Sequence, residues 1–307
     1  MKRNNTVHRR KSKLEVYAIK TYEKLTFVDD FVFCKVVTNH PDLCHELLEL
    51  AIGRKVGAFV RLDRQEPIEI TSDGRGIRFD VYAEDDNQTV YDCEMQTTTN
   101  QNLSKRTRYY QGMIDLNLIE RGQDYCELKK SYIIFICPFD AFGRGLHKYT
   151  FEHRCLEDVS LGLGDEATVI FLCADGDADD ISEDMKDFLN YVSGKEGAGR
   201  LVRGLDDAVK KVRNHEEWRL EYMTLQMRDQ EMMKKGREEG REEGRNLQLW
   251  KMIQKKIVKG KSLEQIADEL EEREEDIRLL YEQVKEEQFE TMNFAVDANT
   301  ENFTLGE

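Results

Sequence analysis

The segments Ile77-Arg-Phe-Asp-Val-Tyr-Ala83 and Thr89-Val-Tyr-Asp-Cys-Glu-Met-Gln96 are joined by the polar run 84–88. Both segments alternate between apolar and polar residues, and this period of two predicts a pair of β-strands with a turn between them. The polar face of the first strand contains Asp80, and the polar face of the second contains Glu94. The predicted apolar faces consist of Ile77, Phe79, Val81 and Ala83, and of Tyr91, Cys93 and Met95.

An antiparallel hairpin symmetric about Asn87 places Asp80 directly opposite Glu94, with Gln96 on the same face. Directly opposed residues have Cβ atoms about 4.5–5.5 Å apart, so the two carboxylates repel each other unless a cation lies between them. Oxygen ligands of this kind suit a hard divalent ion such as Mg²⁺ or Mn²⁺. The alternative is an exposed acidic face of the hairpin, on which the carboxylates are simply hydrated.

Three runs of sequence, 76–85, 90–96 and 106–115, carry a resemblance to a known family. They resemble the family of recombination-promoting nucleases and transposases, a branch of the PD-(D/E)XK nuclease superfamily. The resemblance extends from about Asp29 to Cys173 and also includes the glycine-and-charge repeat near the C-terminus. It implies an α/β fold with a restriction-endonuclease-like core, a mixed central sheet flanked by helices, followed by an α-helical C-terminal extension.

The resemblance also implies a metal-dependent phosphodiesterase in which Asp80 and Glu94 bind the ion, Mg²⁺ or Mn²⁺. Gln96 occupies the position at which the superfamily has a lysine, and a neutral amide can only form hydrogen bonds. We therefore expect Lys105 or Arg106, which follow shortly in the sequence, to supply the positive charge. Because the family resembles this chain in its Glu-x-Gln pattern, Gln96 is predicted to be a catalytic residue that positions the attacking water.

Superfamily members often add an acidic residue from the first core helix, and the sequence predicts a helix over 41–53. Its apolar stripe is flanked by Glu46 and Glu49, three positions apart. The resemblance favours Glu49 as a further catalytic residue, whereas most acids on an amphipathic helix are simply solvated.

A second helix is predicted from about Leu103 to Arg121, ended by Gly122. Cations in a first helical turn interact unfavourably with the helix dipole, but in a nucleic-acid-binding protein they can bind phosphates. We expect this turn to bind DNA phosphates beside the metal site; alternatively, it is a solvated basic turn that pairs with the acids of 84–86. The predicted DNA contacts are Lys105, Arg106, Arg108, Tyr109 and Tyr110. The predicted buried face consists of Tyr110, Met113, Ile114 and Asn117.

The chain has 307 residues, 35% of them charged, and a formal net charge of −15. A net negative body repels nucleic-acid phosphates, but residues 1–20 contain seven cations and one acid. We expect this basic arm, 1–25, to contact DNA, although a tail that serves only solubility is the common alternative. No apolar run follows the basic start and no stretch is long enough to span a bilayer, so we predict a cytoplasmic protein without membrane association.

The seven cysteines are odd in number and show no Cys-x-x-Cys spacing, which argues against disulfides and a zinc site. A free cysteine in an apolar pattern behaves as a small buried hydrophobe. The six histidines lack the pattern of a catalytic triad or a zinc-binding helix, so we expect no catalytic role for them.

The chain divides by composition into parts of different character. The core, 26–175, continues after the basic helix with strands predicted over 131–137, 148–155 and 167–173. We then predict a helical extension over 176–235, a Gly/Arg/Glu repeat linker over 236–246, a small helical module over 247–285 and an acidic disordered tail over 286–307.

Two of these parts allow a second interpretation. The repeat 236–245 places Gly236, Gly240 and Gly244 one helical turn apart. Each helical glycine costs about 1 kcal/mol relative to alanine, so the segment is a hinge or a marginal helix, and a glycine stripe also permits close self-association. The segment 262–270 is similar to a helix-turn-helix, but the acids that follow it favour a small interaction module over a DNA reader.

Together these patterns predict a metal-dependent DNA endonuclease, working as a homodimer because double-strand cutting needs two active sites. The ion held by Asp80 and Glu94 would activate water and stabilise the pentavalent phosphate. Two alternatives stay open: a DNA- or partner-binding protein that retains the nuclease fold with a weak or inactive site, and a helical scaffold assembled through 201–285. No pattern in the sequence indicates a preferred DNA sequence, cleavage of RNA or a biological role.

Overall fold

The computed structural model of the chain describes residues 20–68, 77–99 and 102–286. They form two compact units, which divide between Met223 and Thr224. Most of the predicted basic arm and nearly all of the predicted acidic tail lie outside the described residues. None of the helices in the described part of the chain combines the length and the apolar character that a membrane span requires.

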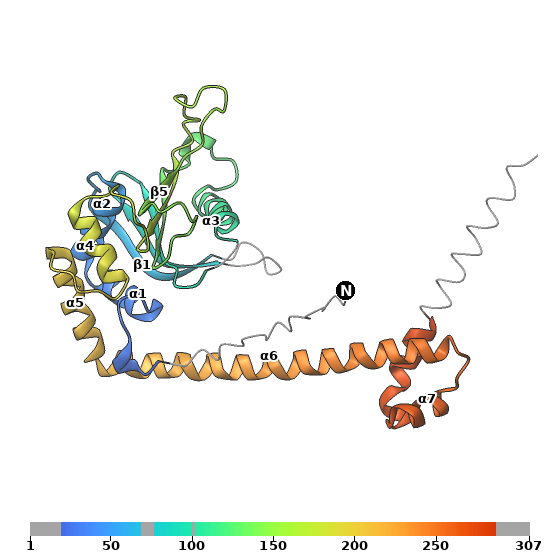
Figure 1. Cartoon of the computed structure of the whole chain (residues 1–307). Helices are drawn as coiled ribbons and strands as arrows, with labels where there is room; N and C mark the ends of the chain where they lie inside the picture. The colour runs from blue at the N-terminus through green and yellow to red at the C-terminus, as the bar shows by residue number, and fades with distance from the viewer. Residues whose placement is uncertain (1–19, 69–76, 100–101, 287–307) are drawn as a thin grey trace, which may run out of the picture. The chain divides into compact units, whose positions relative to one another are not determined.

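A six-stranded mixed sheet is the centre of the first unit (Figure 1). The strands are β1 (Phe59–Ile68), β2 (Ile77–Asp85), β3 (Val90–Met95), β4 (Ser131–Cys137), β5 (Lys148–Phe151) and β6 (Ala167–Cys173). They lie in the order β1-β2-β3-β4-β6-β5. β1, β2 and β3 are antiparallel neighbours, β4 and β6 run parallel to β3, and β5 is an antiparallel edge strand.

Helices cover both faces of this sheet (Figure 1). One side carries α1 (Asp30–Asn39), α2 (Pro41–Ile52), α4 (Glu183–Val192) and α5 (Arg200–Arg213), and the other carries α3 (Leu103–Leu118). Two short 3₁₀ helices, η1 (Tyr22–Lys24) and η2 (Tyr125–Glu127), also belong to the unit. The predicted α/β architecture, a mixed central sheet flanked by helices, is confirmed.

The hairpin of β2 and β3 has the predicted register. Val81 lies opposite Cys93, as a hairpin symmetric about Asn87 requires, so the next positions are Asp80 and Glu94. The apolar and polar faces of β3 do not correspond to a buried and an exposed face, because all six of its residues are buried. Helices on both sides of the sheet leave neither face of this strand in water.

α3 forms where the sequence predicts it, although it ends at Leu118 rather than Arg121. The predicted Tyr110, Met113 and Ile114 are buried against the sheet. Asn117 is exposed, because the buried face continues instead through Thr107 and Leu103 at the start of the helix.

α1 is absent from the sequence-based prediction, because its pattern is that of a buried strand. All seven residues from Phe31 to Val37 are buried, and a helix buried on every side has no amphipathic stripe to reveal it. Lys35, only 1% exposed, donates to Glu221 near the start of α6 (Glu216–Ile257). α1 therefore lies between the sheet and helices from much later in the sequence.

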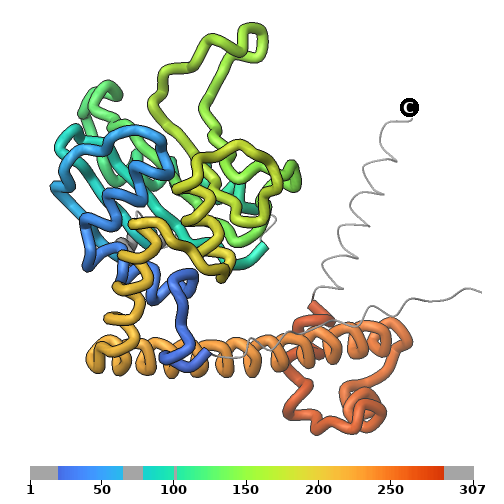
Figure 2. The backbone as a smooth tube through the Cα atoms, turned by 60° about the vertical axis from the view of Figure 1, so that its left-hand side comes forward, coloured from blue at the N-terminus to red at the C-terminus, as the bar shows by residue number. Residues whose placement is uncertain are grey.

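Residues beyond the predicted core boundary at 175 belong to the same compact unit. Figure 2 shows α4 and α5, in yellow and gold, beside the blue α1 and α2. Tyr22 Oη donates to the carbonyl of Val212 at 2.5 Å, and Arg213 Nε donates to the carbonyl of Leu25 at 2.6 Å. The basic arm therefore ends before residue 25, because Tyr22 and Leu25 are already part of the core.

The second unit is a small helical cluster. It contains the C-terminal part of α6, α7 (Leu263–Leu270) and a helix over 274–286. Ser262 and Gln265 form a capping box at the start of α7. The three helices share a core formed by Ile253, Ile266, Ala267, Ile277 and Val284.

The predicted linker over 236–246 is helical and forms part of α6. Of the two conformations that the glycine repeat allowed, the helix and not the hinge is present. Lys235 and Glu239, four positions apart, form an ion pair at 3.7 Å. This ion pair offsets a small part of the cost of the glycines.

We expect replacement of Gly236, Gly240 and Gly244 by alanine to stabilise α6, by about 1 kcal/mol at each site. No described atom beyond the local helix backbone lies within 4 Å of a Cβ added at these positions. Thermal melts followed by far-ultraviolet circular dichroism should therefore show a higher midpoint for the triple variant. Gly204→Ala in α5 is the matched control, because its Cβ would lie 2.6 Å from Leu43 and oppose the same gain. A lower midpoint for the triple variant would contradict a continuous α6.

Candidate functional site

Asp80 and Glu94 meet at the end of the β2–β3 hairpin. The backbone N–H of Asp80 donates to Glu94 Oε1 at 3.0 Å, and the N–H of Met95 donates to Asp80 Oδ2, also at 3.0 Å. Each carboxylate therefore lies against the backbone of the opposite strand. Glu94 is only 1% exposed, so a hydrated acidic face is excluded for this residue.

Asp92 is a further acid on β3, two positions before Glu94. It is fully buried, and no donor in the described part of the chain reaches either of its carboxylate oxygens. Burial, followed by the charges of Glu94 and Asp80, raises the pKa of Asp92 well above its ordinary value. A buried acid without a donor requires either a bound proton or a cation.

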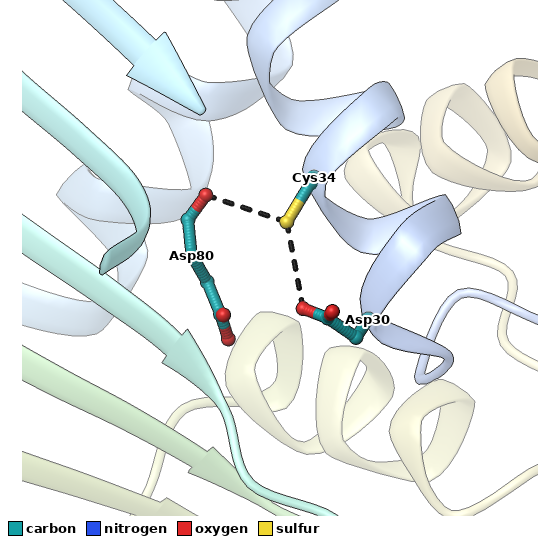
Figure 3. Close-up of side chains that lie close together, drawn as sticks. All are labelled: Asp30, Cys34 and Asp80. Atoms are coloured by element: carbon teal, nitrogen blue, oxygen red, sulfur yellow. Dashed lines mark hydrogen bonds between the residues drawn. The ribbon is translucent and has the colours of Figure 1, made fainter. Parts of the chain in front are cut away.

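The fourth acid comes from α1. Asp30 lies in the first turn and Cys34 one turn later, so both are on the side of α1 that faces Asp80 (Figure 3). The Cys34 thiol donates to Asp30 Oδ1 at 3.6 Å and to the carbonyl of Asp80 at 3.3 Å. Ligand atoms of all three residues lie within 4.8 Å of one another, a grouping that could hold a metal ion. Asp30 is exposed, so solvent reaches this end of the group.

The acids predicted from α2 lie elsewhere. Glu49 accepts from Lys55 Nζ at 2.8 Å, and Glu46 lies 3.8 Å from Arg200 Nε. Both acids line a cavity of about 630 Å³ between α2 and the start of α5, and none of their described contacts involves the hairpin. Among the described residues, α1 and not α2 presents a carboxylate to β2, so the structure brings Asp30 to Asp80 and leaves Glu49 elsewhere.

Arg106 of α3 approaches the same carboxylates from the other face of the sheet. Its Nη2 donates to Glu94 Oε2 at 2.6 Å, its Nη1 to Gln96 Oε1 at 2.8 Å, and its Nε to Tyr110 Oη at 2.7 Å. The guanidinium also lies over the Tyr110 ring, 4.8 Å from the centroid. Of the two cations proposed from sequence, Arg106 rather than Lys105 thus places a positive charge beside Glu94.

Gln96 is engaged at both ends of its amide. Its Oε1 accepts from Arg106, and its Nε2 donates to the carbonyl of Thr98 at 2.6 Å and to Thr98 Oγ1 at 3.1 Å. The side chain is 7% exposed. In this arrangement Gln96 orients Arg106, which differs from the water-positioning role that we predicted.

The five predicted nucleic-acid-binding residues divide into two groups. Arg106 and Tyr110 are turned toward the sheet, as their contacts with Glu94 and the core show. The acids proposed as partners of this turn have other contacts, since Glu84 pairs with Lys129 and Asp85 accepts from backbone N–H groups. The exposed members of the set are Lys105, Arg108 and Tyr109.

Three of these acids, Asp80, Asp92 and Glu94, bind protons more tightly than isolated carboxylates do. Burial, followed by the charges of Glu94 and Asp30, raises the pKa of Asp80 to about 9. Burial also raises the pKa of Glu94, although Arg106 opposes this shift. A divalent cation would replace these protons, and carboxylate oxygens are the ligands that Mg²⁺ and Mn²⁺ prefer. The residues present therefore fit a divalent metal ion.

Comparison with known families agrees with this geometry. Residues 28–172 match the family described as PD-(D/E)XK nuclease family transposase. This segment of the chain belongs to that family. The match includes α1, the β2–β3 hairpin and α3, and the fold is the restriction-endonuclease-like fold of PD-(D/E)XK proteins. Membership in the PD-(D/E)XK family indicates a nuclease-type function. No curated protein and no solved structure matches the chain.

The structure brings Asp30 and Asp92 close to Asp80 and Glu94, and we did not predict either of these two acids from sequence. Asp92 had a usable signal, because it shares with Glu94 and Gln96 the strand face on which the site lies. The sequence contained no comparable signal for Asp30. Asp30 and Cys34 share a face only if their segment is a helix, and α1 was not predicted.

Proposed function

We propose that this protein is a metal-dependent DNA endonuclease that hydrolyses phosphodiester bonds. The convergence of Asp30, Asp80 and Glu94, next to the buried Asp92, is the observation that supports this function. Carboxylates gathered in a region of low exposure require bound protons or a cation. A bound divalent ion supplies an activated water molecule and stabilises charge on the reacting phosphate.

The side chains around the ion have separate roles in this proposal. Asp80 and Glu94, joined by Asp30, would hold the metal. Arg106 keeps Glu94 oriented, and because its side chain is 32% exposed, the guanidinium can also meet a phosphate oxygen. A guanidinium suits phosphate in geometry and charge, so Arg106 would stabilise the transition state as the superfamily lysine does, with Gln96 holding it in place.

The exposed side chains of α3 would bind the DNA backbone. Lys105 and Arg108 offer charges for phosphate contacts that are independent of base sequence, and Tyr109 offers a ring or a hydroxyl group. Such a local basic surface can bind DNA although the whole chain carries a charge of −15. Homodimer formation, DNA contact by the basic arm and a cytoplasmic location remain part of the proposal.

Nicking of supercoiled plasmid DNA tests the proposed activity. We expect the wild-type protein to nick the plasmid in Mg²⁺ or Mn²⁺ and to stop when EDTA removes the ion. A closed circle has no ends, so nicking identifies an endonuclease. DNA binding without cleavage in any divalent ion would favour the alternative, a binding protein that retains the nuclease fold.

The stabilisation of the fold by Mg²⁺ is expected to increase with pH. Asp80 loses its proton near 3.8 in the unfolded chain but near 9 in the metal-free fold. Between these values the fold binds more protons than the unfolded chain, so the metal-free protein loses stability as pH rises. Mg²⁺ binds the deprotonated form, so its affinity increases by up to about tenfold for each unit by which the pH rises.

Differential scanning fluorimetry with and without Mg²⁺ measures this dependence. From about pH 6 to about pH 8.5, the Mg²⁺-induced shift in melting temperature should grow by about 3 °C per pH unit. Asp80→Asn is the control, and its shift should be small and independent of pH. An equal shift for the wild-type protein at both ends of the range would contradict the proposed protonation of Asp80.

A further inference from the structure

Cys34 differs from other buried cysteines of the chain in what its thiol contacts. It is 2% exposed, yet its sulfur lies between the carboxylate of Asp30 and the backbone of Asp80. Cys44 in α2 is equally buried, and burial alone raises the pKa of its thiol. A cysteine that served only to fill space would not require two acidic neighbours.

The donor atoms of Asp30, Cys34 and Asp80 are close enough to share one ion (Figure 3). Three atoms at most 4.8 Å apart all lie within 4.8 Å divided by the square root of three, about 2.8 Å, of a common point. Metal–sulfur bonds are about 2.3 Å and metal–oxygen bonds about 2.0–2.2 Å. Side-chain movements of less than about 1 Å would therefore bring all three donors to bonding distance.

An independent observation indicates that a cation belongs in this group. Asp92 is fully buried, and neither of its carboxylate oxygens receives a hydrogen bond from any described donor. Arg106 neutralises one carboxylate of the group, that of Glu94. The negative charge available from Asp30, Asp80 and Asp92 exceeds the positive charge that contacts them, which favours a bound dication.

We propose that Cys34 is a metal ligand together with Asp30 and Asp80, and that the centre therefore prefers a thiophilic transition-metal dication, such as Co²⁺ or Zn²⁺, to Mg²⁺. Mg²⁺ is a hard ion that binds oxygen, whereas a thiolate donor favours softer first-row metals. When the metal–sulfur bond forms, the thiol proton passes to the solvent. The inference rests on the proposed function, because it adds a ligand to the same centre.

Titration of the metal-free, full-length protein with Co²⁺ tests the proposal without a cleavage assay. Charge transfer from a thiolate to Co²⁺ gives a near-ultraviolet absorption band, which carboxylate ligands do not give. We expect the band in the wild-type protein and in the matched control Cys44→Ser, and its loss in Cys34→Ser. Cys34→Ser should weaken Co²⁺ binding by about tenfold or more, and Mg²⁺ binding by no more than about threefold.

Two results would overturn the proposal. An undiminished band in Cys34→Ser would mean that another cysteine binds Co²⁺, and an unchanged Co²⁺ affinity would mean that sulfur contributes nothing to the centre. Cys34→Ala is the second variant, and it should give the same losses with the melting temperature of the metal-free fold retained.

The same titration separates this inference from the proposed function. Suppose that the wild-type protein binds a divalent ion without a sulfur band, and that Asp80→Asn abolishes this binding. The metal centre would then be supported, and Cys34 would not be one of its ligands. No binding of Co²⁺ or Mg²⁺ at all would remove both.

Discussion

Replacing Asp80 by asparagine is expected to abolish metal-dependent cleavage, with a loss of at least about 100-fold in rate. The amide keeps the size of the side chain and can still accept the hydrogen bond from Met95, but it brings no negative charge to a dication. Because Asp80 holds a proton in the metal-free fold, the neutral amide should leave the melting temperature unchanged or raise it. Plasmid nicking rates and thermal melts, measured together, separate a loss of chemistry from a loss of fold.

Asp63→Asn is the matched control for this variant. Asp63 lies on the adjacent strand β1 and binds Arg61 at the surface, at 2.5 Å, so its loss should leave cleavage unchanged. Glu94→Gln should behave as Asp80→Asn does. Nicking by Asp80→Asn at the wild-type rate would show that the proposed centre is not where the chemistry occurs.

Removing the guanidinium of Arg106 is expected to impair both the fold and the reaction. Arg106→Ala leaves Glu94 buried without its partner, which costs about 3–5 kcal/mol of stability unless the acid takes up a proton. It also removes the charge proposed to face the phosphate, and such a loss typically lowers the rate by about 100-fold to 1,000-fold. Arg106→Lys should recover much of the stability, since an ammonium group still pairs with Glu94. It should recover less of the rate, because one ammonium group cannot reproduce the bonds to Gln96 and Tyr110.

Arg108→Ala provides the comparison for Arg106. Arg108 lies two positions further along α3 and is exposed, so we expect weaker DNA binding with unchanged turnover at saturating DNA. The slope of log affinity against log salt concentration should fall by about one. Equal effects of the two substitutions on turnover would contradict the proposal that Arg108 binds DNA phosphates whereas Arg106 belongs to the active centre.

The hairpin could be predicted from sequence because two local constraints agree there. A period of two fixes which side chains share a face, and the turn around Asn87 fixes the register, so the contact between Asp80 and Glu94 could be predicted. The helix from Leu103 and the strands of the parallel part of the sheet have equally local patterns. The metal and the catalytic roles are chemical interpretations of these positions and remain predictions.

What could not be predicted depends on contacts between distant parts of the chain. α1 is buried between the sheet, α2 and the much later helix α5, so its own residues carry no helical stripe. Because the sequence pattern identified α2 but not α1, the helix-borne acid predicted from sequence was Glu49 and not Asp30. The direction of the Arg106 side chain depends in the same way on Glu94 and Gln96, which belong to another element.

The hydrogen bonds from Tyr22 to Val212 and from Lys35 to Glu221 span 190 and 186 residues of chain. A nascent polypeptide that has emerged only as far as Cys173 already contains every proposed metal ligand, but it lacks the helices that hold α1 in place. Closing so long a loop is slow, and it requires the ribosome to have synthesised at least residue 221. The proposed metal centre is therefore completed late in biosynthesis, and the family-matched segment is shorter than the compact unit that contains it.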